Sequence, residues 1–346
     1  MWTKSKVLVI AIVAALGLSA CSGGPDGQAG ESGKKTLVVG DVGGWAKSHF
    51  AAAGLLDDLP YEIEFKDLAG ASAYATLSSG QVDVGVWGFD ANGAKTIVNG
   101  SDARIIGLIG REDDSDAAKA QGNINLFVSK KSGIGNLGDL KGKTIGVNWG
   151  EGTTADVVLH GALAEANLTK DDLEVKYFTD ATGNTAYLSG QLDGFVTSVN
   201  AALVDDIDKG ETQIVYYANQ ASAVSYVITS TESKIADADK KDAIADWVGR
   251  VTQYYDWRGV SENAQGFGKA VAEQMSVDQD LGSEVANYIA QTVQVQEFSD
   301  DRIADYQADL DLLKDWGLLD ETIDATALID TSFAAQIAAA KQPAKG

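Results

Sequence analysis

The sequence predicts an α/β protein of two similar lobes, each a mostly parallel sheet flanked by helices, with a ligand cleft between the lobes. Three observations lead to this fold class. Short β-branched runs alternate with helical patterns, the order of these elements recurs after about 110 residues, and the loops after the predicted strands are rich in glycine. Alternation of strands and helices is typical of α/β domains with parallel sheets.

The alternation begins near Thr36. A strand is predicted from Thr36 to Gly40, a helix from Trp45 to Leu56, and a second strand from Tyr61 to Phe65. A second helix ends near Gly80 and leads into a third strand from Val82 to Val86. The strands are recognised by β-branched and alternating residues, and the helices by longer amphipathic spacing between glycines.

An internal repeat is the second observation. The segment LSSGQVDV, residues 77–84, is echoed by YLSGQLDG, residues 187–194, which places Gly80 and Gly190 110 residues apart. Two further pairs have offsets of 108 and 112: Thr36–Gly40 with Thr144–Asn148, and Tyr61–Phe65 with Leu173–Tyr177. Chance similarity between α/β segments is the alternative, and three nearly equal offsets argue against it. Two copies are too few for a solenoid and indicate two lobes, each with its own sheet.

The glycine-rich loops are the third observation. Open α/β sheets bind ligands beyond the carboxyl ends of their strands, so the loops of two facing lobes would enclose a shared cleft. Glycine lets backbone N–H groups approach a ligand closely. The loops concerned are residues 40–45, 69–72, 87–93, 148–154 and 180–184.

The side chains of these loops leave the charge of the ligand open. None of the five loops contains Lys or Arg, so an anion would be held by N–H groups, hydroxyls and helix dipoles. The loops do contain Asp41, Asp90 and Glu151, which would favour an ammonium group or a cationic ring, and nearby aromatic faces would add to that attraction. A zwitterion such as an aminosulfonate would satisfy both halves.

Each of these residues also has a structural alternative. Asp41 can cap a helix, and Asp90 and Glu151 can point into the solvent. Trp87 ends a predicted strand and fits the core better than the pocket, whereas Trp149 fits both equally well.

The N-terminal segment has the pattern of a secretion signal. Lys4 and Lys6 precede an apolar run of twelve residues, Val7–Leu18, which would rise about 18 Å as a helix and is too short for a ~30 Å bilayer core. The ending Leu18-Ser19-Ala20-Cys21 resembles the bacterial lipobox, which implies removal of residues 1–20 and lipidation of Cys21. Residues 21–35 are rich in glycine and serine and are interpreted as a flexible tether.

Composition argues against several classes of function. With 27 Lys+Arg and 50 Asp+Glu the net charge is −23, which disfavours nucleic acid and an anionic bilayer surface as partners. Cys21 is the only cysteine, and His49 and His160 are the only histidines. These counts argue against disulfides, against metal sites built from Cys or several His, and against a His-dependent catalytic triad. We expect no metal, no cofactor and no enzymatic activity, although the acids leave paired-carboxylate hydrolysis open.

Four stretches carry a resemblance to a known family, in residues 53–64, 77–85, 134–168 and 315–319. They include AGLL, LSSGQVDVG, IGNLGDLKGKTIGVN and DWGLL. Their order and spacing resemble the substrate-binding lipoproteins of ABC importers for aliphatic sulfonates, taurine and nitrate, and the related thiamine-pyrimidine binders. The resemblance spans about residues 36–333 and implies a type II periplasmic-binding fold. Its domains would be lobe 1 (36–121 and 222–335), lobe 2 (122–221) and a C-terminal tail (336–346).

The same resemblance implies where the ligand contacts lie. Carried over by motif, they fall on or near Trp45, Ser72, Gly88, Phe89, Asp90, Gly152, Thr153, Thr154, Ser198 and Asn200, and we add Glu151 from the same loops. Similar sulfonate binders tend to have an acidic-Ala-Pro-Pro turn at residues 89–92 and a Trp-Asp-Pro turn at residues 198–200, and this chain has neither. These are pocket positions, so the ligand can differ while the fold is kept.

The function expected from these observations is a receptor that hinges near Gly122 and Ser222, closes on a small molecule and presents it to an ABC-transporter permease. We expect a monomer anchored to the bacterial cell membrane only through its N-terminal lipid. The expected ligand is an organic sulfonate or aminosulfonate such as taurine, or a related anion. The alternative is a cationic or heterocyclic nitrogen compound, such as an amine or a thiamine-type pyrimidine. An enzyme derived from this fold, or an adhesin that no small molecule stabilises, ranks below both.

Overall fold

The computed structural model describes residues 35–179, 181–290 and 293–341, and the chain divides after Gly33. The expected signal peptide, Cys21 and all but the last residue of the tether lie outside the described residues, as do residues 342–346 of the expected tail. Residues 336–341 of that tail belong to helix α14 (Ala334–Lys341), whose Ile337 is buried. Within the described ranges, no helix combines the length and the apolar character needed to cross a bilayer.

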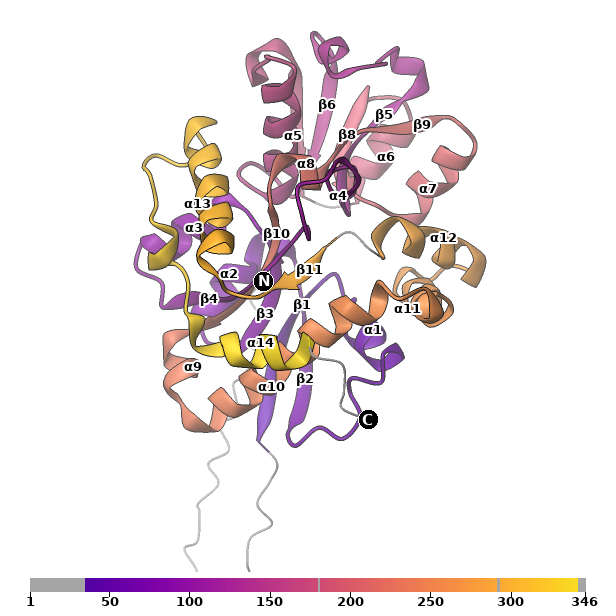
Figure 1. The fold of residues 1–346 in the computed structure, drawn as a ribbon. Coiled ribbons are helices and arrows are strands. Elements are labelled where there is room, and N and C mark those ends of the chain that lie inside the picture. Colours follow the sequence, from indigo (N-terminus) through magenta and orange to yellow (C-terminus); the bar gives the residue numbers. More distant parts are fainter. Residues whose placement is uncertain (1–34, 180, 291–292, 342–346) are drawn as a thin grey trace, which may run out of the picture. The chain divides into compact units, whose positions relative to one another are not determined.

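Two mixed sheets organise the body of the chain. The first has the order β11 (Gln294–Gln296), β4 (Ala103–Gly110), β10 (Val224–Thr231), β3 (Val84–Gly88), β1 (Thr36–Val42) and β2 (Glu62–Leu68). The second has the order β7 (Glu174–Phe178), β6 (Thr144–Asn148), β8 (Gly194–Ser198), β5 (Ile124–Ser129) and β9 (Thr212–Tyr217). Figure 1 shows the second sheet above the first.

The two sheets share one strand order, which confirms two similar α/β lobes. The order β2-β1-β3-β10-β4 matches β7-β6-β8-β5-β9 strand for strand. In each sheet the first three of these strands are parallel, and the fourth is antiparallel to both its neighbours. The reversed strands, β10 and β5, are the ones that the chain enters directly after passing from one sheet to the other. Most strands of each sheet therefore run in one direction, as predicted.

The strand register corrects two of the three predicted offsets. Val39 pairs with Val84 and Ile145 with Gly194, so the first strands are 106 residues apart (145 − 39) and the third strands 110 (194 − 84). The second strands are also 110 apart (174 − 64), since Val38 pairs with Glu64 and Thr144 with Glu174. The predicted 108 and 112 each differ from these by two residues. A slip of two keeps every side chain on the same face of a strand, so the hydrophobic pattern does not detect it.

Helices cover both faces of each sheet. Those that follow strands of the first sheet are α1 (Ala46–Ala52), α2 (Ala73–Ser78) and α3 (Ala91–Val98), and those beside the second are α5 (Thr154–Glu165), α6 (Thr182–Leu188) and α7 (Ala201–Asp208). Short helices α4 (Asp116–Lys119) and α8 (Ala218–Ala221) lie in the two passages between the sheets. The predicted helix Trp45–Leu56 is shorter in the structure because Gly54, at φ +69°, ends it.

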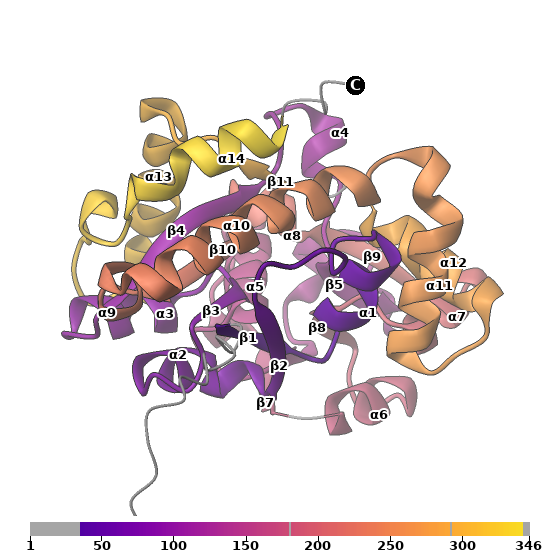
Figure 2. The ribbon, with the colours of Figure 1, turned by 90° about the horizontal axis from the view of Figure 1, so that it is seen from below.

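The remaining helices come from the C-terminal part of the chain. They are α9 (Glu232–Ala236), α10 (Ala238–Arg258), α11 (Ala264–Met275), α12 (Gln279–Ile289) and α13 (Asp300–Asp315), followed by α14. Figure 2 shows α10 and α14 side by side, and these two helices are in contact. Helix α11 packs on α1 and α12 contacts α7, so this hairpin touches elements of both lobes. The exact lobe boundaries near Gly122 and Ser222 stay a prediction.

Equivalent aspartates mark the repeat at the level of single hydrogen bonds. Asp83 Oδ2 accepts the N–H of Val38 at 2.9 Å, and Asp193 Oδ2 accepts the N–H of Thr144 at 2.9 Å. Asp83 is also paired with Lys234 and Lys240, each at 2.7 Å. The repeat is thus a repeat of structure, with one copy elaborated by later helices.

Candidate functional site

A cavity of about 490 Å³ lies between the carboxyl ends of the two sheets. The first sheet contributes the loops after β1, β2 and β3, through residues such as Trp45, Gly70 and Asp90. The second contributes the loops after β6 and β8, through Thr154 and Ser198 among others. Loops of both sheets meet here because equivalent strands of the two copies end at the same place.

The cavity gathers some of the residues named from the sequence. Those among its lining are Trp45, Gly88, Asp90, Thr153, Thr154 and Ser198. Those outside the lining are Ser72, Phe89, Glu151, Gly152 and Asn200.

Each residue outside the lining has another contact in the structure. Ser72 Oγ donates to the carbonyl of Ala69, and Asn200 caps α7 by accepting the N–H of Leu203. Phe89 is 2% exposed and packs edge-on against Tyr306 in the core. Glu151 is exposed and forms an ion pair with Lys170 at 2.9 Å. Gly152 accepts the N–H of Ala91 through its carbonyl oxygen at 3.0 Å.

Asp90 is the carboxylate of the cavity wall. It is the N-cap of α3, and its Oδ1 accepts the N–H of Gly93 at 2.7 Å. Burial raises the pKa of Asp90 to about 7, although the N–H groups of Gly93 and Asn92 work against that shift. Close to neutral pH this side chain therefore exists in both forms, and a charged ligand would select between them.

Asp41 stabilises the start of a helix, which is the structural alternative to ligand binding that the sequence left open for it. Both its carboxylate oxygens accept the N–H of Ala46, at 3.0 and 3.1 Å, so it holds the start of α1. Burial raises its pKa, and these backbone bonds oppose the shift. Asp41 lies near the end of β1, and its bonds to the start of α1 hold the segment next to Trp45, which does line the cavity.

The two lobes are in close contact at Gly88 and Thr154. A Cβ atom added to Gly88 would lie 2.1 Å from Thr154 Oγ1 and 3.2 Å from Thr154 Cβ. Next to this contact, the N–H of Ala91 donates to Gly152 O at 3.0 Å, and Asn92 Nδ2 donates to Glu151 O at 3.0 Å. The loops after β3 and β6 are therefore hydrogen-bonded to each other at the edge of the cavity, and the two lobes are in direct contact there.

Gly88→Ala is expected to weaken the binding of any small molecule in the cavity about tenfold, because relieving such an overlap costs about 1–3 kcal/mol and 1.4 kcal/mol is a factor of ten. With Thr154→Ala the nearest atom of residue 154 is its Cβ, so Gly88→Ala should cost less affinity in a Thr154→Ala background than in the natural chain. Gly266→Ala, where the nearest atom is 3.5 Å away, is the matched control. Isothermal titration of the natural chain, the three single variants and the double variant checks this, and equal affinity in the natural chain and Gly88→Ala would contradict it.

The loop after β6 is held in a strained conformation. Trp149 has φ +66°, which is uncommon for a residue with a large side chain, and it lines the cavity. Thr153 Oγ1 donates to Gly150 O at 2.7 Å, and Asp156 Oδ2 accepts the N–H of Gly152 at 2.9 Å. These bonds fix the turn that places Trp149 and Thr154 at the cavity.

C-terminal helices supply a wall that the sequence reasoning missed. Tyr254, Tyr255 and Arg258 of α10, together with Gln274 and Met275 of α11, are part of the lining. The Arg258 guanidinium lies 4.2 Å from the centre of the Tyr255 ring. A signal was present, since aromatic and basic residues are spaced three or four apart at the end of α10, but only the packed structure turns them toward the loops of the first sheet.

His49 joins this wall to the first lobe. Tyr254 Oη donates to His49 Nδ1 at 2.8 Å, and His49 Nε2 donates to Gln274 Oε1 at 3.1 Å. Gln274 Nε2 in turn donates to Gly43 O at 3.4 Å, so the chain of bonds reaches the β1 loop. Burial, aided by the positive charge of Arg258, lowers the pKa of His49 to about 4. His49 is therefore neutral at physiological pH.

Aromatic side chains dominate the wall of the cavity. They are Trp45, Tyr74, Trp87, Trp149, Tyr226, Tyr254 and Tyr255. Trp87 is 4% exposed and serves both core and cavity, since its indole N–H donates to Thr229 Oγ1 and its ring lies over Gly85. Such walls accept flat or methylated groups, and Asp90 and Arg258 add one charge of each sign.

Comparisons with known proteins show which sequences and structures this chain resembles. Residues 117–254 match the sequence profile of the family described as NMT1/THI5 like. The arginine-binding extracellular protein ArtP of Bacillus subtilis (strain 168) is 30% identical over 159 residues, a match that spans 42% of this chain and 56% of ArtP. The alkanesulfonate-binding protein SsuA from Xanthomonas axonopodis pv. citri bound to MOPS superposes with a TM-score of 0.71 at 19% identity, over 86% of this chain and 99% of that chain. The chain has the two-lobed fold of the periplasmic binding proteins.

This periplasmic-binding fold is not confined to receptors. The desulfurization enzyme DSZB superposes with a TM-score of 0.59 at 15% identity, over 89% of this chain and 100% of that chain. The fold alone thus does not decide between binding and catalysis, which depend on the residues of the site. Among the described residues, no group of three or more His, Cys, Asp and Glu side chains is placed to hold a metal ion.

Proposed function

We propose that the chain is the extracytoplasmic solute receptor of an ABC importer and holds a small organic molecule between its two lobes. The observation that carries this proposal is the cavity itself, which is enclosed by loops of both sheets that hydrogen-bond to each other over it. Binding and release then require only that the lobes close and open, with no bond chemistry. The closed receptor would be presented to a permease.

The proposed binding residues are those of the earlier prediction that line the cavity, joined by Tyr254, Tyr255 and Arg258. Trp45 and Trp149 would pack on the body of the solute, and Thr154 and Ser198 would offer hydroxyls. Asp90 and Arg258 would interact with the charged groups of the solute. Ser72, Phe89, Glu151, Gly152 and Asn200 would act by shaping the loops.

An organic sulfonate or aminosulfonate is the first candidate ligand. Arg258 supplies a cation that the loops themselves lack, and the similar SsuA structure is that of an alkanesulfonate-binding protein bound to MOPS. Taurine is small for this site, because 490 Å³ corresponds to roughly 16 water molecules at about 30 Å³ each. A larger sulfonate that carries a ring or an amine fits the volume and the aromatic wall better.

A cationic or heterocyclic nitrogen compound is the second candidate. Asp90 faces the cavity among aromatic rings, an arrangement that suits an ammonium or a cationic ring. The partial relative ArtP is described as arginine-binding, and the matched family is described as NMT1/THI5 like. An enzyme is a weaker candidate, since the lining offers no cysteine and its one histidine is neutral and engaged on both ring nitrogens.

Attachment and assembly belong to the same proposal. Lipidation of Cys21 would tether the receptor to the cell membrane, and residues 21–35 would let it turn toward its permease. The body would act as a monomer. Metabolic labelling with a fatty-acid analogue, in the natural chain and in Cys21→Ala, tests the anchor.

Thermal unfolding in the presence of a ligand panel tests the receptor function. The panel contains alkane- and arylsulfonates, taurine, nitrate, amines, arginine and pyrimidines. A ligand at a hundred times its Kd should stabilise the fold by about 2.7 kcal/mol. Thr154→Ala should reduce that shift while leaving the ligand-free transition almost unchanged, whereas Thr169→Ala, on an exposed turn outside the lining, should not reduce it. A hit that is consumed during incubation would identify an enzyme instead.

A further inference from the structure

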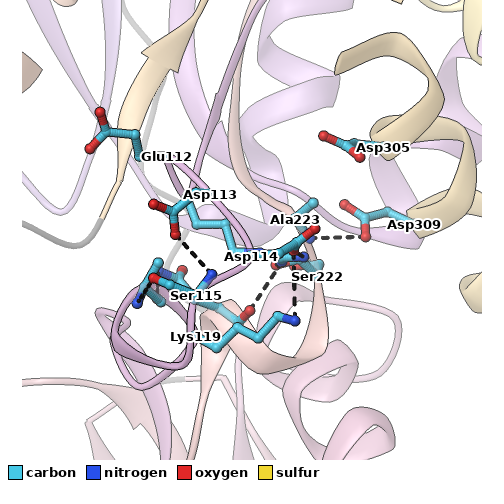
Figure 3. Close-up of polar contacts among 12 residues, drawn as sticks. Glu112, Asp113, Asp114, Ser115, Lys119, Ser222, Ala223, Asp305 and Asp309 are labelled. Carbon is cyan, nitrogen blue, oxygen red and sulfur yellow. Dashed lines mark hydrogen bonds and ion pairs between the residues drawn. The ribbon is translucent and has the colours of Figure 1, made fainter. Parts of the chain in front are cut away.

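Two charged residues, Arg111 and Asp309, hold the segment through which the chain returns from the second lobe to the first. Arg111 directly follows β4, where the chain leaves the first sheet, and Asp309 lies on α13. Among the described residues, neither belongs to the lining of the cavity. Figure 3 shows Asp309 directed from α13 toward Ala223, in the returning segment.

Arg111 binds the outgoing strand to the returning segment. Its Nη1 donates to the carbonyl oxygens of Ser222, at 2.6 Å, and Asn219, at 3.1 Å. Its backbone N–H donates to Ala223 O at 3.1 Å. The other edge of the guanidinium donates to Asp114 Oδ1, through Nε at 3.0 Å and Nη2 at 2.5 Å, which fixes its orientation.

Asp309 holds the same segment from the opposite side. Its Oδ1 accepts the N–H of Ala223 at 3.0 Å and its Oδ2 accepts the N–H of Val224 at 2.8 Å. Within residues 219–224, the Asp309 carboxylate thus accepts two backbone N–H groups, and the Arg111 guanidinium donates to two backbone carbonyl oxygens. The lobes can rotate against each other only if this backbone changes its dihedral angles, because the segment joins them.

Keeping a carboxylate here is costly. Asp309 is 4% exposed, and burial raises its pKa to about 7 against the two N–H groups and the nearby Arg111. The other groups that face it are Asp305 and Tyr306 of its own helix. A buried charge destabilises unless it is hydrogen-bonded, and an apolar side chain would fill the same space at lower cost. The contacts that the carboxylate makes therefore matter more than its contribution to stability.

The residues that Arg111 and Asp309 hold are linked to the cavity through the residues that follow them in β10. The pairing of β10 with β4 has an irregularity between Val224 and Tyr226, directly after the residues that Asp309 holds. Tyr226 lines the cavity and its hydroxyl accepts Asn123 Nδ2, from the other passage between the lobes, at 3.2 Å. Ser225 O accepts the N–H of Phe89, between Gly88 and Asp90 in the β3 loop, at 2.9 Å. A shift of residues 223–224 would therefore move the cavity wall.

We propose that Arg111 and Asp309 form a hinge clamp that sets the angle between the lobes and so regulates closure of the cavity from outside it. This inference rests on the proposed receptor function, because the closure has a purpose only if a solute is captured. In this view both are positioning residues. They favour the closed arrangement seen here, in which the loops after β3 and β6 touch.

The distance between two spin labels tests the clamp without any ligand. Exposed Asn99 and Glu165, at the far ends of α3 and α5, are changed to cysteine in the full-length chain carrying Cys21→Ser, and pulsed electron resonance gives their distance distribution. The unmodified clamp should give a narrow distribution, because a hinge segment whose backbone is held on both sides allows only a small range of angles between the lobes. Asp309→Asn, which sets an amide N–H₂ against a backbone N–H, should add a population several ångströms longer.

Controls separate the clamp from general damage to the fold. Asp311→Asn changes an exposed carboxylate on the same helix, which accepts Gln307 Nε2 at 2.9 Å, and should leave the distribution unchanged. Arg111→Lys keeps the charge but reaches fewer carbonyls, so it should lengthen the distances less than Arg111→Gln, and this pair decides the question if Asp309→Asn fails to fold. Unchanged distributions in the folded Asp309 and Arg111 variants would overturn the clamp. Because no solute is added, a ligand screen without hits would count against the receptor function and leave this result independent.

Discussion

Asp90→Asn should change ligand affinity more than any other single substitution in the cavity. For a cationic solute we expect a loss of about 2–5 kcal/mol, the usual effect of removing one partner of a buried charge pair. For a sulfonate we expect tighter binding at pH 8, since the variant no longer places a negative charge beside the ligand. Isothermal titration at pH 5.5, 7 and 8.5 distinguishes the two.

The pH dependence of ligand affinity in the unmodified protein gives a second test of the Asp90 charge. Because the pKa of Asp90 is raised to about 7, the side chain becomes ionised as the pH rises through neutrality. Affinity for a cation should therefore increase across that interval, affinity for an anion should fall, and Asp90→Asn should show neither trend. Glu151→Gln is the matched control, because Glu151 is exposed, paired with Lys170 and outside the lining. An identical change in both variants would remove Asp90 from the binding site.

Acidification should destabilise the fold through His49. Burial lowers the pKa of His49 to about 4, against 6.5 for an unperturbed histidine, so between these values the unfolded chain takes up a proton that the folded chain does not. The contribution of neutral His49 to the free energy of unfolding is fully present above pH 6.5 and is lost as the pH falls to 4. The difference between a pKa of 6.5 in the unfolded chain and about 4 in the folded chain corresponds to about 3 kcal/mol of free energy of unfolding. Urea unfolding at pH 4, 5, 6.5 and 8 measures it.

His49→Gln should lose most of this pH dependence, since glutamine stays neutral and can still bond to Tyr254. Asp90→Asn should alter the profile in the opposite sense. A carboxyl with a raised pKa binds its proton more tightly in the folded state, so it contributes stability that is lost as the pH rises from 3.8 to about 7. Parallel stability profiles for His49→Gln and the unmodified chain would show that His49 does not titrate in this interval.

The fold could be predicted because its signals are local and repeated. Strand–helix alternation and the motif around Gly80 and Gly190 identified two α/β lobes, and the two sheets have the same strand order. What the sequence could not give was the exact register, since a slip of two residues preserves the face of every side chain. It also did not show that β10 and β5 enter their sheets in reverse, because a strand carries no mark of its direction.

The candidate site was predicted in part for a similar reason. Loops that follow strands are local features, and they place Trp45, Asp90 and Thr154 at the cavity. Within a loop, however, neighbouring residues point in different directions, so Phe89 enters the core while Asp90 lines the cavity. Tyr254 and Arg258 come from a distant part of the chain, since Tyr254 lies 205 residues after its partner His49, and only long-range packing brings them to the cavity.

The aspartates that precede β3 and β8 allow a measurement that few proteins offer. Asp83 and Asp193 accept an equivalent backbone N–H at the same distance, but in the described part of the chain only Asp83 is also paired with lysines, supplied by α9 and α10. Asparagine introduced at each position in turn would show how much the two lysine counterions add to a contact that is otherwise the same in both lobes. The second lobe thus supplies, within one polypeptide, the reference for a contact in the first.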